Sequence, residues 1–165
     1  MTSWEARDWV NTGGTVTARD PQLGQRLIGH GLQQIPLEAH AWFNLGIALH
    51  QQRKINAAIR AYQHCLRLPG GPEAQATNNL SQDLLLSGAF AQGWTLYEQR
   101  LRLPKYDNST FEGWAGPSWQ GPHDPRPCEH LVLVAEQGFG DTLQFVRLAQ
   151  LLQHQGLQIT LFCQP

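Results

Sequence analysis

The stretch AEQGFGDTLQFVR, Ala135 to Arg147, contains the residues of this chain whose types and spacing come nearest to a site for chemistry. Glycine-rich turns that open a helix bind phosphate groups through backbone N–H groups. A dinucleotide fingerprint needs glycine at the position of Leu143, and a Walker loop needs a lysine, but no lysine follows Lys105. The stretch therefore completes neither phosphate-binding pattern.

A structural interpretation of the same turn needs no ligand. Asp141 is then the N-cap of a helix, and Gln144 completes a capping box with it. Gly138 and Gly140 permit a tight turn between a strand and this helix.

A second group of candidates consists of carboxamides. Asn44 and Asn79 lie 35 positions apart, and each stands one residue before a leucine that recurs at the same interval. A carboxamide both donates and accepts hydrogen bonds, so it can bind a peptide unit without selecting the side chain. The alternative is that both asparagines are surface residues that cap or solvate a helix.

The sequence predicts no metal site and no cofactor. None of the seven histidines stands at HxxxH or HExxH spacing, so we interpret them as surface or groove residues. Cys65, Cys128 and Cys163 are too far apart for a disulfide framework or a CxxC metal knuckle and are expected to be reduced thiols.

The elements that must position these residues form a repeat. AYQHCLRLP, residues 61–69, matches LYEQRLRLP, residues 96–104, at an interval of 35. Within one interval, apolar residues at helical spacing form two stripes separated by a polar turn at residues 51–54. This pattern predicts pairs of helices, and an earlier copy shows one helix that begins at Asp20-Pro21 and ends at Pro36.

Four segments follow from these patterns. Residues 1–19 form an N-terminal leader, 20–104 the helical repeats, 105–128 a Pro/Trp-rich linker that packs on a neighbouring surface, and 129–165 an α/β unit. In the last segment, the apolar run at 131–135, a helix from Asp141 and a second run at 157–163 predict strand, helix and strand. The expected fold class is mainly α, an α-solenoid of helix hairpins followed by an incomplete α/β unit.

The repeats resemble the tetratricopeptide family. The signature positions of that family are occupied by Trp42, Leu45, Gly46, Leu49, Ala58 and Tyr62. This resemblance implies a concave groove that binds a protein or peptide, with contacts from Phe43, Ile47, Asn44 and Asn79. The two asparagines are similar to the asparagine ladder in the tetratricopeptide part of O-linked N-acetylglucosamine transferase.

The segment after the linker resembles another family. Trp119-Gln120-Gly121 and the run from Leu131 to Pro165 are similar to the junction in bacterial proteins that join tetratricopeptide repeats to a GT-B type glycosyltransferase, kin of heptosyltransferases. The resemblance implies that Asp141 is a general base on the acceptor side. It also implies a second half that binds the nucleotide sugar, so a nucleotide sugar is expected only for a longer form of the chain.

Composition argues against two classes of function, nucleic-acid binding and membrane insertion. A formal net charge of −1 predicts no nucleic-acid partner, and no apolar run is long enough to predict a membrane span. Without a signal peptide pattern, a cytoplasmic location is expected. The leading hypothesis is a peptide-binding module, the rival is the front part of a sugar transferase, and the reading frame beyond Pro165 would discriminate them. Because two strands and one helix cannot cover the apolar run, we also expect either self-association or docking of this unit against the helical repeats.

Overall fold

The computed structural model describes residues 4–103, 117–119, 121, 124–135 and 138–163. The chain divides into a helical unit, Met1–Asp107, and an α/β unit, Asn108–Pro165. The described residues are mainly helical and carry one small parallel sheet, as the sequence predicted at this coarse level.

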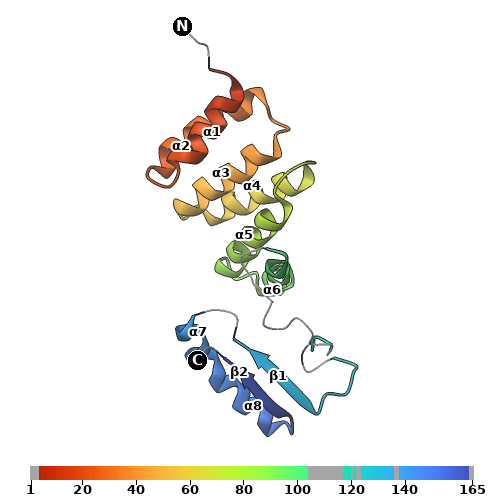
Figure 1. The fold of residues 1–165 in the computed structure, drawn as a ribbon. Coiled ribbons are helices and arrows are strands. Elements are labelled where there is room, and N and C mark those ends of the chain that lie inside the picture. Colours follow the sequence, from red (N-terminus) through yellow and green to blue (C-terminus); the bar gives the residue numbers. More distant parts are fainter. Residues whose placement is uncertain (1–3, 104–116, 120, 122–123, 136–137, 164–165) are drawn as a thin grey trace. The chain divides into compact units, whose positions relative to one another are not determined.

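Helices of the first unit pack in consecutive pairs (Figure 1). The pairs are α1 (Ala6–Val16) with α2 (Pro21–Gln34), α3 (Ala39–Gln51) with α4 (Ile55–Arg67), and α5 (Glu73–Leu86) with α6 (Phe90–Tyr97), which a 3-10 helix (Glu98–Arg102) extends. Contacts are most extensive within each pair, and α2–α3 and α4–α5 join one pair to the next. The described part of this unit is therefore a helical array of repeat-like character.

The sequence predicted only the second helix of the pair α1–α2, because α1 lies within the segment predicted as a leader. Its sequence ARDWVNTGGTV contains two adjacent glycines and β-branched residues, which are poor helix formers. Packing overrides this weak propensity. A Cβ added to Gly13 would lie 2.6 Å from Cγ1 of Ile28, so glycine is what lets α1 approach α2.

Short turns with defined backbone geometry separate the helices of each pair. The Asp20 carboxylate accepts a hydrogen bond from the Leu23 N–H at 2.9 Å and caps α2, as predicted. Arg53 and Gly88, 35 positions apart, occupy the same left-handed conformation in the next two turns, with φ of 59° and 85°. Glycine adopts this conformation freely, whereas arginine is held in it by the surrounding structure.

Two clusters of buried side chains meet on α3. One joins Val10, Ile28 and Leu32 of the first pair to small residues of α3, and the other joins Leu49 and Tyr62 to residues of α5. Gly46 lies directly against the Tyr62 ring, in the same way that Gly13 lies against Ile28. The first two pairs thus close through a glycine of the first helix against a large residue of the second, whereas in the third pair Gly93 of α6 lies against Leu85 of α5.

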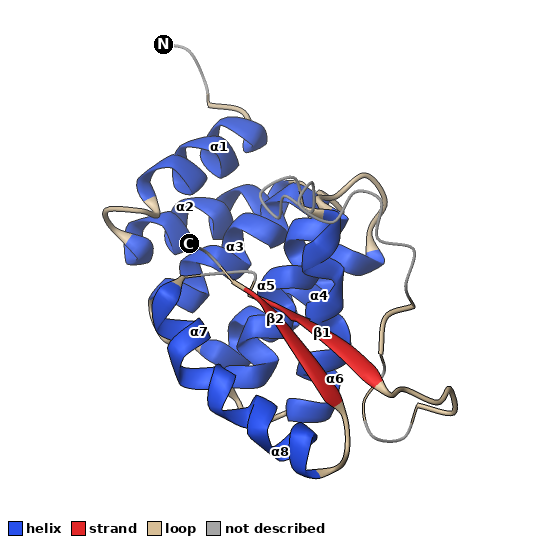
Figure 2. Ribbon diagram, turned by 60° about the horizontal axis from the view of Figure 1, so that its bottom comes forward, coloured by secondary structure: helices blue, strands red, loops and turns tan. Residues whose placement is uncertain are grey.

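The α/β unit is small and open. Strands β1 (His130–Val134) and β2 (Gln158–Phe162) lie side by side and parallel, with His130 opposite Gln158 (Figure 2). Between them the single predicted helix is α7 (Phe139–Phe145), a 3-10 turn (Val146–Leu148) and α8 (Ala149–His154). Neither α7 nor α8 has a buried residue.

The described residues contain no helix that is both long and apolar enough to cross a membrane.

Candidate functional site

The predicted peptide-contact residues lie on the first helices of two successive pairs, Asn44, Phe43 and Ile47 on α3 and Asn79 on α5. All four side chains are half-buried. Phe43 and Ile47 pack against the cluster around Leu49 and Tyr62, so only part of each side chain faces solvent.

The two asparagines differ in their surroundings. Asn44 lies beside α1, where a Cβ added to Gly14 would be 3.0 Å from its Nδ2 atom. Asn79 points toward α4, and its Nδ2 atom donates to the Tyr62 hydroxyl at 3.4 Å. This distance is at the long limit for a hydrogen bond, so the Asn79 carboxamide is only weakly held.

A third asparagine, Asn11 on α1, was missed by the sequence analysis. The α1 sequence WVNTG, residues 9–13, repeats as WFNLG, residues 42–46. Because Gly13 and Gly46 make equivalent contacts with α2 and α4, Asn11 occupies the position of Asn44 in its own pair. The signal was the identical Trp-x-Asn-x-Gly pattern at an interval of 33 rather than 35.

A buried acid–histidine pair connects α3 to α5. His50 Nδ1 lies 2.6 Å from Asp83 Oδ1, and the side chains are 38% and 0% exposed. Burial raises the pKa of Asp83, and the hydrogen bond with His50 acts in the opposite direction. Asp83 Oδ2 is buried without a hydrogen-bond partner among the described residues, so the carboxylate depends on His50.

Two buried groups of α4, Tyr62 and Cys65, also have raised pKa values. The pKa of Tyr62 is raised chiefly by desolvation, and its hydroxyl accepts a hydrogen bond from the Asn79 side-chain amide. The pKa of the Cys65 thiol is raised for the same reason. Neither group is suited to act as a nucleophile at neutral pH.

The predicted turn in the α/β unit differs from its expected geometry. Gly138, not Asp141, is the N-cap of α7, and no side chain caps this helix, so the predicted capping box with Gln144 is wrong. Neither Gly138 nor Gly140 has a positive φ, and a Cβ on either would meet no atom within 4 Å. The reason is that α7 begins three residues earlier than expected, which places Asp141 in its first turn. Residues 136–137 of the turn lie outside the described residues.

Asp141 is exposed in that first turn, near the carboxyl end of β1. Its backbone N–H donates to the Gly138 carbonyl at 3.1 Å. The N-terminus of a helix stabilises a carboxylate. The side chain is thus available to solvent.

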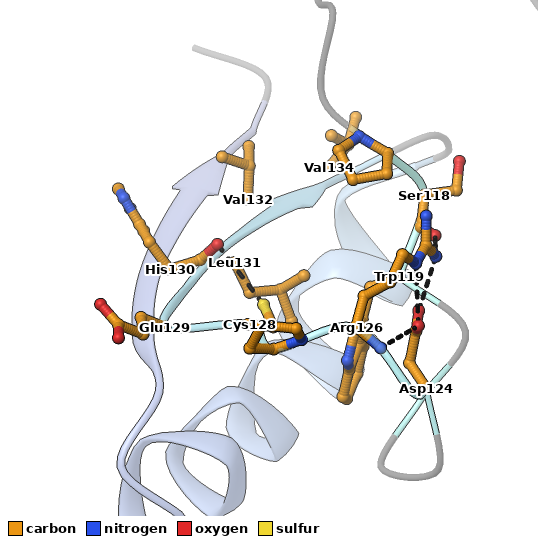
Figure 3. A pocket seen from close by; sticks show the side chains of 12 residues that line it. Ser118, Trp119, Asp124, Arg126, Cys128, Glu129, His130, Leu131, Val132 and Val134 are labelled. Carbon is orange, nitrogen blue, oxygen red and sulfur yellow. Dashed lines mark hydrogen bonds and ion pairs between the residues drawn. The ribbon is translucent and has the colours of Figure 1, made fainter.

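An open pocket of about 420 Å³ lies along β1 (Figure 3). Pro117, Ser118 and Trp119 of the predicted linker line it together with Leu131 and other residues of β1. Residues 105–116, 120 and 122–123 of the predicted linker lie outside the described residues.

Two charged groups of this pocket, Arg126 and Asp124, are paired with each other. Arg126 Nε and Nη2 donate to the two carboxylate oxygens of Asp124 at 2.9 and 2.6 Å, and Nη2 also donates to the Ser118 carbonyl at 2.6 Å. His130 Nε2 lies 2.7 Å from Thr160 Oγ1 on β2. The ion pair fixes the loop beside β1 and is structural in character.

Among the described residues, no group of three or more His, Cys, Asp or Glu side chains could hold a metal ion. No protein-family model and no curated protein sequence matches the chain.

Proposed function

We propose that the helical unit is a peptide-binding module of the tetratricopeptide type. The observation that carries the proposal is the recurrence of asparagine at equivalent positions of successive first helices, Asn11 on α1, Asn44 on α3 and Asn79 on α5. The equivalence is supported by the matched contacts of Gly13 with Ile28 and Gly46 with Tyr62.

The carboxamides supply the affinity for a peptide backbone. Each can donate to a carbonyl and accept from an N–H of an extended segment. Asn11 is exposed, and Asn79 gives up only a 3.4 Å contact with Tyr62 when it turns to a ligand. The exposed parts of Phe43 and Ile47 add apolar contact beside them.

The test is an array of immobilised peptides probed with the whole chain. Loss of one such hydrogen bond weakens binding by about 1 kcal/mol, or about fivefold. The variant with Asn44→Ala and Asn79→Ala should therefore bind selected peptides about 25-fold more weakly, and adding Asn11→Ala should weaken binding further. Asn56→Ala with Gln34→Ala, two exposed carboxamides of second helices, is the matched control.

Two results would refute the proposal. One is an array without signal above background. The other is a peptide whose binding falls no more with the Asn44 and Asn79 changes than with the control pair.

A second candidate is that the chain is the recruiting part of a glycosyltransferase-like protein, with Asp141 as the acceptor-side base. It is supported by the parallel strand–helix–strand order and by the exposed Asp141 in the first turn of α7. A base in that place would take the proton of an acceptor hydroxyl as the new glycosidic bond forms and the bond from the donor sugar to its nucleotide breaks. In a form that contains a donor-binding half, full transfer activity of Asp141→Asn would exclude this role.

A further inference from the structure

A second surface of the helical unit, formed by α3 and α4, is a groove of about 510 Å³. We propose that this groove binds an acidic peptide segment that carries an apolar anchor residue. Its lining includes Trp42, Leu45, Ala57, Arg60, His64 and Arg67. None of these belongs to the asparagine row, which consists of Asn11, Asn44 and Asn79. The inference therefore goes beyond the peptide-binding function proposed above.

The floor of the groove is apolar and rigid. Trp42 is held from two sides, since its Nε1 atom donates to the Pro36 carbonyl at 2.8 Å and its ring lies 4.1 Å from the His64 ring, centroid to centroid. Leu45 and Ala57 are half-buried, so part of their apolar surface faces the groove. Such a preformed floor binds an apolar side chain without having to be ordered first.

The rim of the groove is cationic. Arg60 and Arg67 are exposed, and Arg67 Nη2 lies 3.2 Å from His64 Nδ1. In the described part of the chain, neither arginine takes part in any of the ion pairs found. Their positive charges are therefore available to a partner.

The same charge pattern occurs on α2. Arg26 and His30 precede Arg60 and His64 by 34 positions and, like them, lie four residues apart on one face of a second helix. Neither α2 nor α4 contains an aspartate or glutamate. Although the whole chain has a net charge of −1, α2 and α4 carry arginines and no acidic residue.

The cationic rim and the apolar floor together favour one class of partner. Guanidinium groups bind carboxylates in a planar, two-point geometry, and an apolar floor binds an aliphatic or aromatic side chain. Nucleic acid fits less well, because binding of a phosphate backbone depends on many cationic contacts and gains little from an apolar floor. The groove therefore favours a peptide with both acidic and apolar residues.

The experiment measures fluorescence anisotropy with the whole chain and a labelled peptide of Glu and Ser residues around a central Phe-Leu pair. One comparison peptide replaces every Glu by Gln, and another replaces Phe-Leu by Ser-Ser. Two arginine changes, Arg60→Glu with Arg67→Glu, should weaken binding of the first peptide about tenfold or more. The control, Arg19→Glu with Arg147→Glu, makes the same change in net charge at exposed residues outside the groove.

We expect both comparison peptides to bind weakly and added salt to weaken the first peptide. Circular dichroism verifies that the variants are folded, and Arg60→Gln with Arg67→Gln replaces the charge-reversed pair if they are not. Absence of binding, equal loss in the control pair, or tighter binding of a single-stranded DNA oligonucleotide would overturn the proposal. If Asn44→Ala with Asn79→Ala abolishes binding of the acidic peptide and the Arg60 and Arg67 changes do not, the groove inference fails while the function of the asparagine row stands.

Discussion

The pair of His50 and Asp83 is the part of the structure whose energetic role can be tested most directly. The change His50→Ala leaves the fully buried Asp83 carboxylate without the hydrogen bond at 2.6 Å. A hydrogen bond to a charged group contributes about 1.5–3 kcal/mol to stability. Because the His50 side chain is 38% exposed, solvent screening favours the low end, so we expect a loss of about 1.5 kcal/mol at neutral pH.

The loss should depend on pH, with a sign that follows from the pKa of Asp83. Burial raises this pKa, and His50 lowers it. A carboxyl group with a raised pKa in the folded chain contributes stability that is present below about pH 4 and is lost as pH rises through the folded value. Without His50 the pKa of Asp83 rises further, so the deficit of the variant should grow between about pH 4 and pH 7.

Urea denaturation followed by far-ultraviolet circular dichroism, at about pH 4 and at about pH 7, measures the loss of stability and its dependence on pH. His40→Ala is the matched control, since His40 lies on the same helix with a side chain that is 59% exposed, and should change stability by less than about 0.5 kcal/mol. In an Asp83→Asn background, His50→Ala should lose its pH-dependent deficit. A deficit that is equal at both pH values, or no larger than that of His40→Ala, would refute this account of the pair.

Three further predictions concern packing, reactivity and association. Gly46→Ala should lower stability by about 1 kcal/mol in urea denaturation, because strain against the Tyr62 ring outweighs the gain in helix propensity. Gly29→Ala should raise stability, because the added Cβ meets no atom within 4 Å. A stabilised Gly46 variant would contradict the close contact. Iodoacetamide should modify the exposed Cys163 well before the buried Cys65, whose pKa is raised by burial, and mass spectrometry showing equal rates would argue against a buried thiol. Leu143 and Leu151 are 73% and 58% exposed, so light scattering should give a mass above that of a monomer. Leu143→Glu with Leu151→Glu should reduce this mass. A monomeric wild-type chain would remove the prediction of self-association.

Much of the helical unit could be predicted because its signals are local. Apolar spacing, the Asp20 cap and the recurrence of Tyr62 at residue 97 are all visible within one or two turns of helix or one repeat interval. The helix α1 could not be predicted in the same way, because its local propensity is poor and only the contact between Gly13 and Ile28 explains it. Once α1 is placed, Asn11 joins the row of asparagines.

The sequence by itself determined the second and third helix pairs, their interval and the order strand, helix, strand, because these follow from periodicity and turn chemistry. Only the tertiary structure decided which side chains meet across elements. It placed Asp83 against His50, 33 positions away on another helix, and it moved the N-cap of α7 from Asp141 to Gly138. The physical reason is that such contacts depend on how helices rotate and slide against one another, and a difference of one or two residues changes which atoms touch.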